Sequence, residues 1–259
     1  MGGIGTLLAT LASGVLYAMG RAVPFAFGGT LMAAAVVMLL LFVREPKELE
    51  RTAREDEGLG VLRGIRRVSR EARFSLVLLM GAIFCWFVGY NAVETFLSSY
   101  GVSELGMSVG KAPLLMGVAS LAFLIFALPS GYIAARLGRR RTIITGLVVF
   151  GVLLLTNFFL RSATLIWPIM ALGGMGWALV NINSLPMVVD IAISDADLGT
   201  YTGLYYLASQ LAAVAGPIIN GYIVKWGGGD YNLIFLATPV FFLLAVLCML
   251  RVTKGEARL

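Results

Sequence analysis

Residues 112–160 read APLLMGVASLAFLIFALPSGYIAARLGRRRTIITGLVVFGVLLLTNFFL, two long apolar runs joined by a short basic turn. The runs at 112–135 and 142–160 are close to the roughly 20 apolar residues that a helix needs to cross the hydrocarbon core of a bilayer. The turn 136–141 holds four arginines. The stretch therefore predicts two transmembrane helices that meet at one face of a membrane.

The same pattern runs along the whole chain. Of its 259 residues, 59% are hydrophobic and 13% are charged, whereas soluble domains average about half apolar and about a quarter charged. We therefore expect an all-α membrane protein with eight transmembrane helices. The candidate spans are 4–19, 24–43, 74–99, 112–135, 142–160, 165–189, 201–224 and 232–250. No basic segment precedes the first span, so we expect it to stay in the mature protein rather than to act as a cleaved signal.

Composition also argues against an enzyme. The chain has no histidine, which removes the commonest general base and a common metal ligand. Cys85 and Cys248 are far apart in the sequence, so we expect neither a disulfide framework nor a metal cluster. Walker loops, paired-aspartate motifs and histidine-based nucleophile systems are all missing from the sequence. We expect no cofactor and no metal.

The basic residues alternate between the two predicted faces of the membrane. Of the 20 Lys and Arg residues, 16 fall in 44–73, 136–141 and the tail after 250. The other connections hold Arg21, Lys111, Arg161 and Lys225. By the positive-inside rule, this bias predicts a multi-pass protein of the cell membrane with both termini in the cytoplasm. Because the charge lies between apolar runs, the net charge of +6 does not indicate nucleic-acid binding.

Residues 44–73 form the only long polar stretch and divide the chain into 1–43, 44–73 and 74–259. Leu62, Ile65 and Val68 recur at helical spacing among arginines in its second half. This pattern is typical of an amphipathic helix on an anionic leaflet, although a solvated charged linker explains it equally well.

A faint repeat relates the first two spans to the last two. At an offset of 207 residues, the matching positions are Gly14, Arg44 and Lys47 with Gly221, Arg251 and Lys254. After a slip of one residue, Phe27, Thr30 and Glu48 match Phe235, Thr238 and Glu256. Parallel repeats of helix bundles are a feature of transporters. The repeat predicts that 1–43 holds the last two helices of one bundle and that 74–259 holds a complete six-helix bundle.

The basic turn resembles a known motif. Residues 131–141, GYIAARLGRRR, resemble the G-x-x-x-D-R-x-G-R-R signature of the major facilitator superfamily. The matching residues are Gly131, Arg136, Gly138, Arg139 and Arg140. Ala135 stands at the acidic position, which puts in doubt any gating ion pair that needs this carboxylate. We expect the first glycine to allow close helix packing and the second to allow a sharp reversal. The alternative is an ordinary positive-inside loop.

Two further segments sharpen the resemblance. Residues 174–224 and WFVGYNAVETF from Trp86 look like parts of the sucrose-type proton-coupled solute carriers, relatives of the glycoside-pentoside-hexuronide cation symporters. The resemblance implies the last eight of twelve helices, with a carboxyl-terminal six-helix bundle and two helices of the amino-terminal bundle. It also implies proton-coupled symport of a sugar or oligosaccharide by alternating access.

Polar residues inside the spans predict a solute and proton pathway. Glu94 shares one helix face with Tyr90, Asn91 and Ser98, and a carboxylate in a span usually faces a cavity or a partner. On later spans, Trp177, Asn181 and Ser184 share a face, as do Tyr206 and Gln210. Such a set can hold a sugar, but polar contacts that only join helices are the alternative for each of these residues.

A cytoplasmic gate is the last site that we predict. Asp190 ends the sixth span on the side of the basic turn. We expect it to pair with an arginine of that turn, and Arg136 is the first choice because its usual acidic neighbour is Ala135. The expected partners of the protein are membrane lipids, a small solute and protons.

Two alternatives stay open for the function. One is a truncated, non-transporting fragment that lacks its amino-terminal helices. The other is a facilitator transporter for a different small solute, such as a drug or an amino acid.

Overall fold

The computed structural model describes residues 19–43, 70–191 and 198–255, and scattered positions between Gly5 and Tyr17. Seven helices of this part are long and apolar enough to span a membrane. They are α2 (Val23–Phe42), α5 (Arg70–Ser103), α6 (Leu114–Leu137), α7 (Arg139–Leu160), α8 (Ile166–Val189), α9 (Leu198–Trp226) and α10 (Ile234–Arg251), which follows the short 3-10 helix η2 (Tyr231–Leu233). The chain is therefore an all-helical membrane protein. The predicted first span and amphipathic linker helix lie largely outside the described residues.

The described helices match the predicted spans, and α5, α7 and α9 extend beyond them. Helix α5 starts four residues before the predicted apolar run and continues four residues beyond it. Helix α7 includes all three arginines of 139–141 in its first turn. Apolar character marks only the hydrocarbon core, whereas backbone hydrogen bonding continues the helix into the headgroup region. The first turn of α7, beyond the apolar run, therefore holds basic residues at one end of the bundle.

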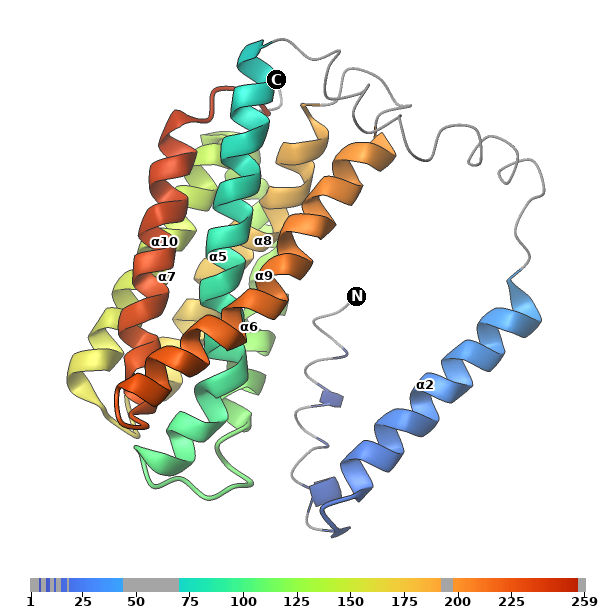
Figure 1. The fold of residues 1–259 in the computed structure, drawn as a ribbon, viewed down its shortest axis with the longest axis vertical. Helices are drawn as coiled ribbons and strands as arrows, with labels where there is room; N and C mark the ends of the chain where they lie inside the picture. Colours follow the sequence, from blue (N-terminus) through green and yellow to red (C-terminus); the bar gives the residue numbers. More distant parts are fainter. Residues whose placement is uncertain are drawn as a thin grey trace.

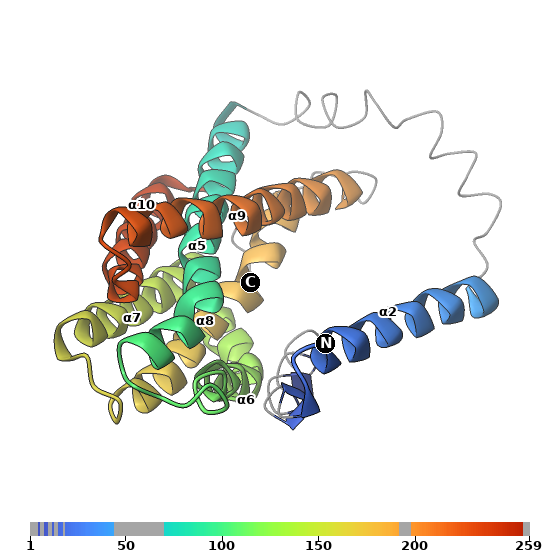
Figure 2. The same ribbon diagram turned by 60° about the horizontal axis from the view of Figure 1, so that its bottom comes forward.

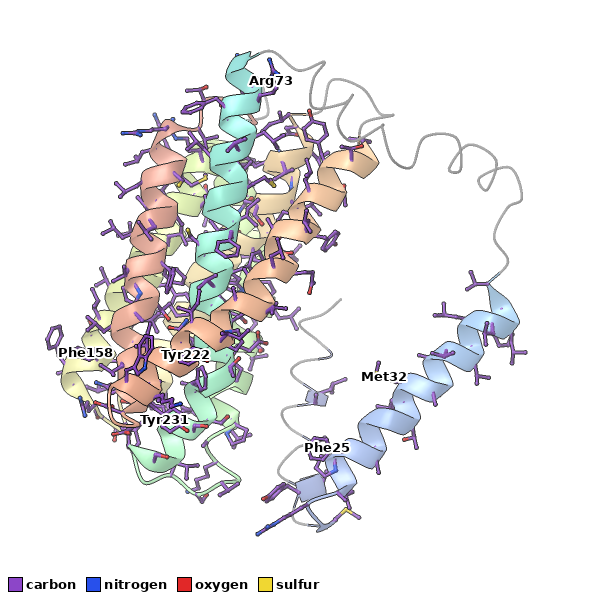
Figure 3. The ribbon with its side chains drawn as sticks, in the orientation of Figure 1. Phe25, Met32, Arg73, Phe158, Tyr222 and Tyr231 are labelled. Carbon is purple, nitrogen blue, oxygen red and sulfur yellow. The ribbon has the colours of Figure 1, made fainter. Side chains whose placement is uncertain are left out.

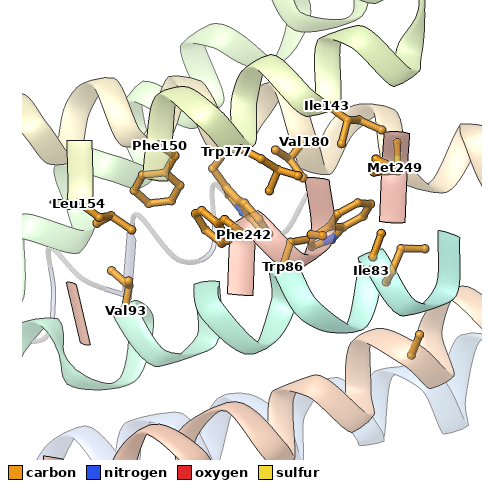
Figure 4. Close-up of a cluster of buried hydrophobic side chains, with 14 of the residues drawn as sticks. Ile83, Trp86, Val93, Ile143, Phe150, Leu154, Trp177, Val180, Phe242 and Met249 are labelled. Carbon is orange, nitrogen blue, oxygen red and sulfur yellow. The ribbon is translucent and has the colours of Figure 1, made fainter. Parts of the chain in front are cut away.

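Helices α5 to α10 pack together, as Figures 1 and 2 show. Helix α5 contacts α9 and α10, while α8 packs against both α6 and α7. Figure 4 shows Trp86, Phe150, Trp177 and Phe242 meeting between four of these helices. The rings of Phe150 and Phe242 lie 5.5 Å apart. This core fixes the relative positions of α5 and α8, which carry the site described below.

Small residues allow the closest helix contacts. A methyl group added to Gly174 of α8 would lie 2.1 Å from the carbonyl oxygen of Ala119 on α6. At Gly216 of α9, it would lie 2.8 Å from the carbonyl oxygen of Val88 on α5. Close backbone approach at small residues is the usual way in which membrane helices associate.

Helix α2 stands apart from the bundle (Figure 1) and has no buried residue. Its side chains are apolar all round, and Phe25 and Met32 project from it in Figure 3. A helix that is apolar on all sides can pack against lipid or against other membrane helices. The assignment of 1–43 to an amino-terminal bundle stays a prediction.

The two cysteines are closer in space than their positions in the sequence indicate. Cys85 lies on α5 and Cys248 on α10, which are neighbouring helices, and both are free thiols. The sulfur of Cys248 lies 3.9 Å from the position that a methyl group on Gly81 would take.

Candidate functional site

A central cavity of about 510 Å³ lies between α5, α8 and α9. Its lining residues are Phe87, Asn91, Asn181, Ile182, Leu185, Pro186, Tyr205, Tyr206, Ser209, Gln210 and Ala213. None of these side chains carries a formal charge. The cavity combines amides and hydroxyls with aromatic rings, so it can bind a neutral solute by hydrogen bonding and stacking.

Four of the predicted pathway residues meet in this cavity. Asn91 comes from α5, Asn181 from α8, and Tyr206 and Gln210 from α9. The amide of Asn91 donates to the carbonyl oxygen of Phe87 at 2.7 Å, which orients its own carbonyl group. Tyr206 is 51% exposed, so its hydroxyl is free to contact a solute.

Trp177 does not line the cavity, contrary to our expectation. The indole is only 4% exposed and stacks on Tyr90, with ring centroids 3.9 Å apart and planes 4° apart. Phe87 meets the same indole edge-on at 5.4 Å. Tyr90 is likewise not part of the lining. Because the rings of Trp177 and Tyr90 cover each other, they support the cavity wall instead of presenting an aromatic face to a solute.

Ser184 is also structural. It is fully buried, and its hydroxyl lies 3.1 Å from the hydroxyl of Tyr205. Its own hydrogen bond to the carbonyl oxygen of Asn181 measures 2.9 Å. The residue thus joins α8 to α9, which was the alternative that we left open for such groups.

Glu94 lies beside the cavity rather than in its lining. It follows Asn91 by three residues on the same face of α5 and is exposed. Glu94 is the only acidic residue in the described membrane spans, of which the one on α5 begins at Ala72. Its position one turn beyond the cavity lining places a carboxylate next to an uncharged cavity.

Among the lining residues that sequence reasoning missed are two aromatic residues and one hydroxyl: Phe87, Tyr205 and Ser209. Phe87 precedes Asn91 by one helical turn, and Ser209 follows Tyr205 by one turn. The i, i+4 spacing of Phe87 with Asn91, and of Tyr205 with Ser209, is the signal that could have found them. The helix faces of Glu94, Trp177 and Tyr206 were predicted instead, so these neighbours were not.

A second cavity of about 960 Å³ lies at the end of the bundle where α6 meets α7. We call it the arginine pocket; it is lined by Gly131, Ala134, Ala135, Arg136, Leu137, Gly138, Arg139, Arg140, Arg141, Ile144, Ile182, Asn183, Pro186 and Leu250. Gly138 joins the two helices with a φ of +88°, a conformation that favours glycine. The predicted sharp reversal is therefore confirmed.

Asp190 forms an ion pair at this end, but with Arg139 rather than with Arg136. The guanidinium carbon of Arg136 instead lies 4.3 Å from the centre of the Tyr132 ring. Arg136 belongs to the last turn of α6, where Tyr132 is one turn away, whereas Arg139 starts α7 on the side of α8. The expected partner, Arg136, was therefore wrong, and the next arginine along the chain, Arg139, forms the ion pair.

Gly131 does not serve close helix packing as expected. No atom lies within 4 Å of a methyl group added there, and the residue lines the arginine pocket. The close contact between α6 and α8 is made at Gly174 instead. Arg140, the remaining residue of the motif, donates to the backbone carbonyl of Leu250 at the end of α10.

Comparison with known proteins shows which family has this architecture. The sequence profile of the Major Facilitator Superfamily matches residues 1–195 and 104–258. The chain belongs to this superfamily. An MFS-type transporter of Gibberella moniliformis is 26% identical over 239 residues, which cover 89% of this chain and 56% of that protein. A siderophore iron transporter of Schizosaccharomyces pombe is 27% identical over 150 residues, or 54% of this chain and 24% of that protein.

A solved structure shows the same fold. The E. coli fucose:proton symporter superposes on this chain with a TM-score of 0.63 at 14% sequence identity. The superposition covers 85% of this chain and 52% of the symporter. The chain thus spans about half the length of the Gibberella transporter and of the fucose:proton symporter.

Proposed function

We propose that the chain contributes the solute-binding bundle of a secondary transporter for a neutral, hydroxyl-rich solute. The observation that carries the proposal is the uncharged central cavity, in which Asn91, Asn181 and Gln210 offer amides from three helices. Amides can both donate to and accept from sugar hydroxyls. A sugar or oligosaccharide is therefore the solute class that the lining favours.

We propose further that Glu94 couples transport to protons. A carboxylate inside a span is costly when ionised, so its protonation can follow the opening of the cavity to either side. The face of α5 that it shares with Asn91 connects the proton site to the solute site. In alternating access, the two bundles of such a transporter rock around a central site.

Transport in proteoliposomes tests this proposal. We expect the protein to accumulate a neutral sugar when a pH gradient is imposed, and we expect Glu94→Gln to abolish accumulation while solute exchange persists. Glu104→Gln is the matched control, because Glu104 follows the end of α5 and lies outside the spans. Equal accumulation by Glu94→Gln and the control would contradict the role of Glu94.

Two alternatives have their own outcomes in this assay. Saturable solute binding without any uptake would favour the non-transporting fragment. The aromatic lining of Phe87, Tyr205 and Tyr206 also suits an amphipathic compound, and the siderophore transporter among the relatives shows that cargo varies. Uptake or binding of such compounds, with no response to sugars, would favour a facilitator of different specificity.

A further inference from the structure

The arginine pocket carries more positive charge than the bundle neutralises. Four arginines line it, and the only acidic side chain that pairs with them among the described residues is Asp190, on Arg139. Arg136, Arg140 and Arg141 have no carboxylate within salt-bridge distance in the part of the chain that the structure describes. At the position where the superfamily motif has an acid, this chain has Ala135.

We propose that this pocket binds the phosphate group of an anionic membrane lipid. A phosphate supplies the acceptor oxygens that guanidinium groups bind best, in a charge-assisted and often bidentate manner. The lipid phosphate would take the place of the carboxylate that Ala135 lacks. This inference concerns the lipid environment and does not depend on the identity of the solute.

The geometry of the pocket suits a headgroup. Its volume of about 960 Å³ exceeds that of the central cavity. The arginines come from both sides of the Gly138 reversal, so they converge from the end of α6 and the start of α7. Arg140 uses one guanidinium nitrogen on the carbonyl of Leu250, and this neutral acceptor leaves its charge uncompensated.

Its surroundings favour a lipid over a free anion. Ala134, Ile144, Ile182 and other apolar residues form the rest of the wall. Leu137 is 54% exposed and Tyr132 is 59% exposed, so the arginines adjoin a surface that suits acyl chains. Aromatic residues and arginines are both enriched where a membrane protein meets the headgroups. Basic pockets between helices on the cytoplasmic side bind acidic headgroups, and the distribution of charge predicts that side here.

A bound lipid would act on the same structural unit as the ion pair. Arg139 connects the start of α7 to Asp190 at the end of α8. A phosphate on Arg136, Arg140 and Arg141 would connect the end of α6 to this unit. Anionic lipid would thereby stabilise the arrangement of α6, α7 and α8 that the structure shows.

The test compares lipid binding by the purified chain and its variants in nanodiscs, with native mass spectrometry and thermal unfolding as readouts. The probe is phosphatidylglycerol in a phosphatidylcholine background. Each basic residue near an anionic headgroup contributes about fivefold in affinity. Arg140→Gln combined with Arg141→Gln should therefore weaken phosphatidylglycerol binding by about 25-fold. Arg251→Gln is the matched control, because Arg251 is exposed at the same end of the bundle but does not line the pocket.

A second variant keeps the test decisive if arginine replacement impairs folding. Ala135→Asp places a carboxylate in the pocket and should reduce phosphatidylglycerol binding without removing any arginine. Equal binding by wild type, Ala135→Asp and the double arginine variant would overturn the proposal. Stabilisation of the chain in pure phosphatidylcholine by soluble glycerol 3-phosphate, to the same extent as by phosphatidylglycerol, would show a free-anion site and would also overturn the lipid assignment.

Discussion

The central cavity and the arginine pocket lie on either side of the same stretch of α8, yet their chemistry is opposite. Ile182 and Pro186 line both of them. Asn181 faces the central cavity, where amides and aromatic rings carry no charge. Asn183, two residues later, lines the arginine pocket but is buried and donates to Ser130 and to the carbonyl oxygen of Leu179.

The contrast follows from what each cavity must do in a membrane. A site near the middle of the spans has to be neutral when empty, because an unpaired charge there is costly. A cavity at the end of the bundle can keep its arginines, because headgroups and water solvate them. The same stretch of α8 can therefore border an uncharged cavity on one side and a charged cavity on the other.

The largest expected effect concerns the packing of α6 against α8, on which both cavities depend. Gly174→Ala would bring a methyl group to 2.1 Å from the carbonyl oxygen of Ala119. Because a backbone atom cannot move aside easily, we expect a loss of about 1–3 kcal/mol of stability or more. Thermal unfolding in detergent measures this loss.

Gly131→Ala is the control for that prediction. It adds the same methyl group on α6, where no atom lies within 4 Å. We expect an unchanged or slightly higher Tm, since alanine favours a helix over glycine. A Tm loss of equal size for both variants would mean that the close packing at Gly174 is not what holds α6 to α8.

A smaller effect is expected for the ion pair of Asp190 and Arg139. Both side chains are partly exposed, at 30% and 25%, and such pairs contribute under about 1 kcal/mol. We expect Asp190→Asn and Arg139→Gln each to increase reagent access to the central cavity from the arginine end. The double variant should be no more accessible than either single variant.

Arg136→Gln is the control that distinguishes loss of this ion pair from loss of any one positive charge in the turn. Arg136 lies over Tyr132 and forms no ion pair with Asp190, so in detergent without anionic lipid its replacement should leave access to the cavity unchanged. Additive increases for Asp190→Asn and Arg139→Gln, or an equal increase for Arg136→Gln, would show that the pair does not gate access to the cavity.

The fold was largely predictable because the bilayer restricts what a span can be. Length, apolar content and the alternation of basic residues placed the helices from α5 to α10 to within four residues at their ends. The position of α2 relative to the bundle was not predictable, because its apolar residues surround the helix and mark no preferred face.

The site was predictable only in part. Spacing brought Asn91, Asn181, Tyr206 and Gln210 to one cavity, since residues on one helix face share an environment. Spacing could not predict which side chains are buried. Trp177 shares a face of α8 with Asn181, but Tyr90 of α5 covers its ring. The partner of Asp190 was missed for a similar reason, because the Gly138 reversal decides which arginine faces α8.

Cysteine protection on α9 tests most directly whether the central cavity binds the solute. In a background with Cys85→Ser and Cys248→Ser, Gln210→Cys and Leu211→Cys place thiols at adjacent exposed positions, of which only Gln210 lines the cavity. A charged thiol reagent should label Gln210→Cys, and the transported solute should slow that reaction while leaving Leu211→Cys unaffected. If the solute does not protect Gln210→Cys, or if it protects both positions equally, the cavity between α5, α8 and α9 is not the solute site.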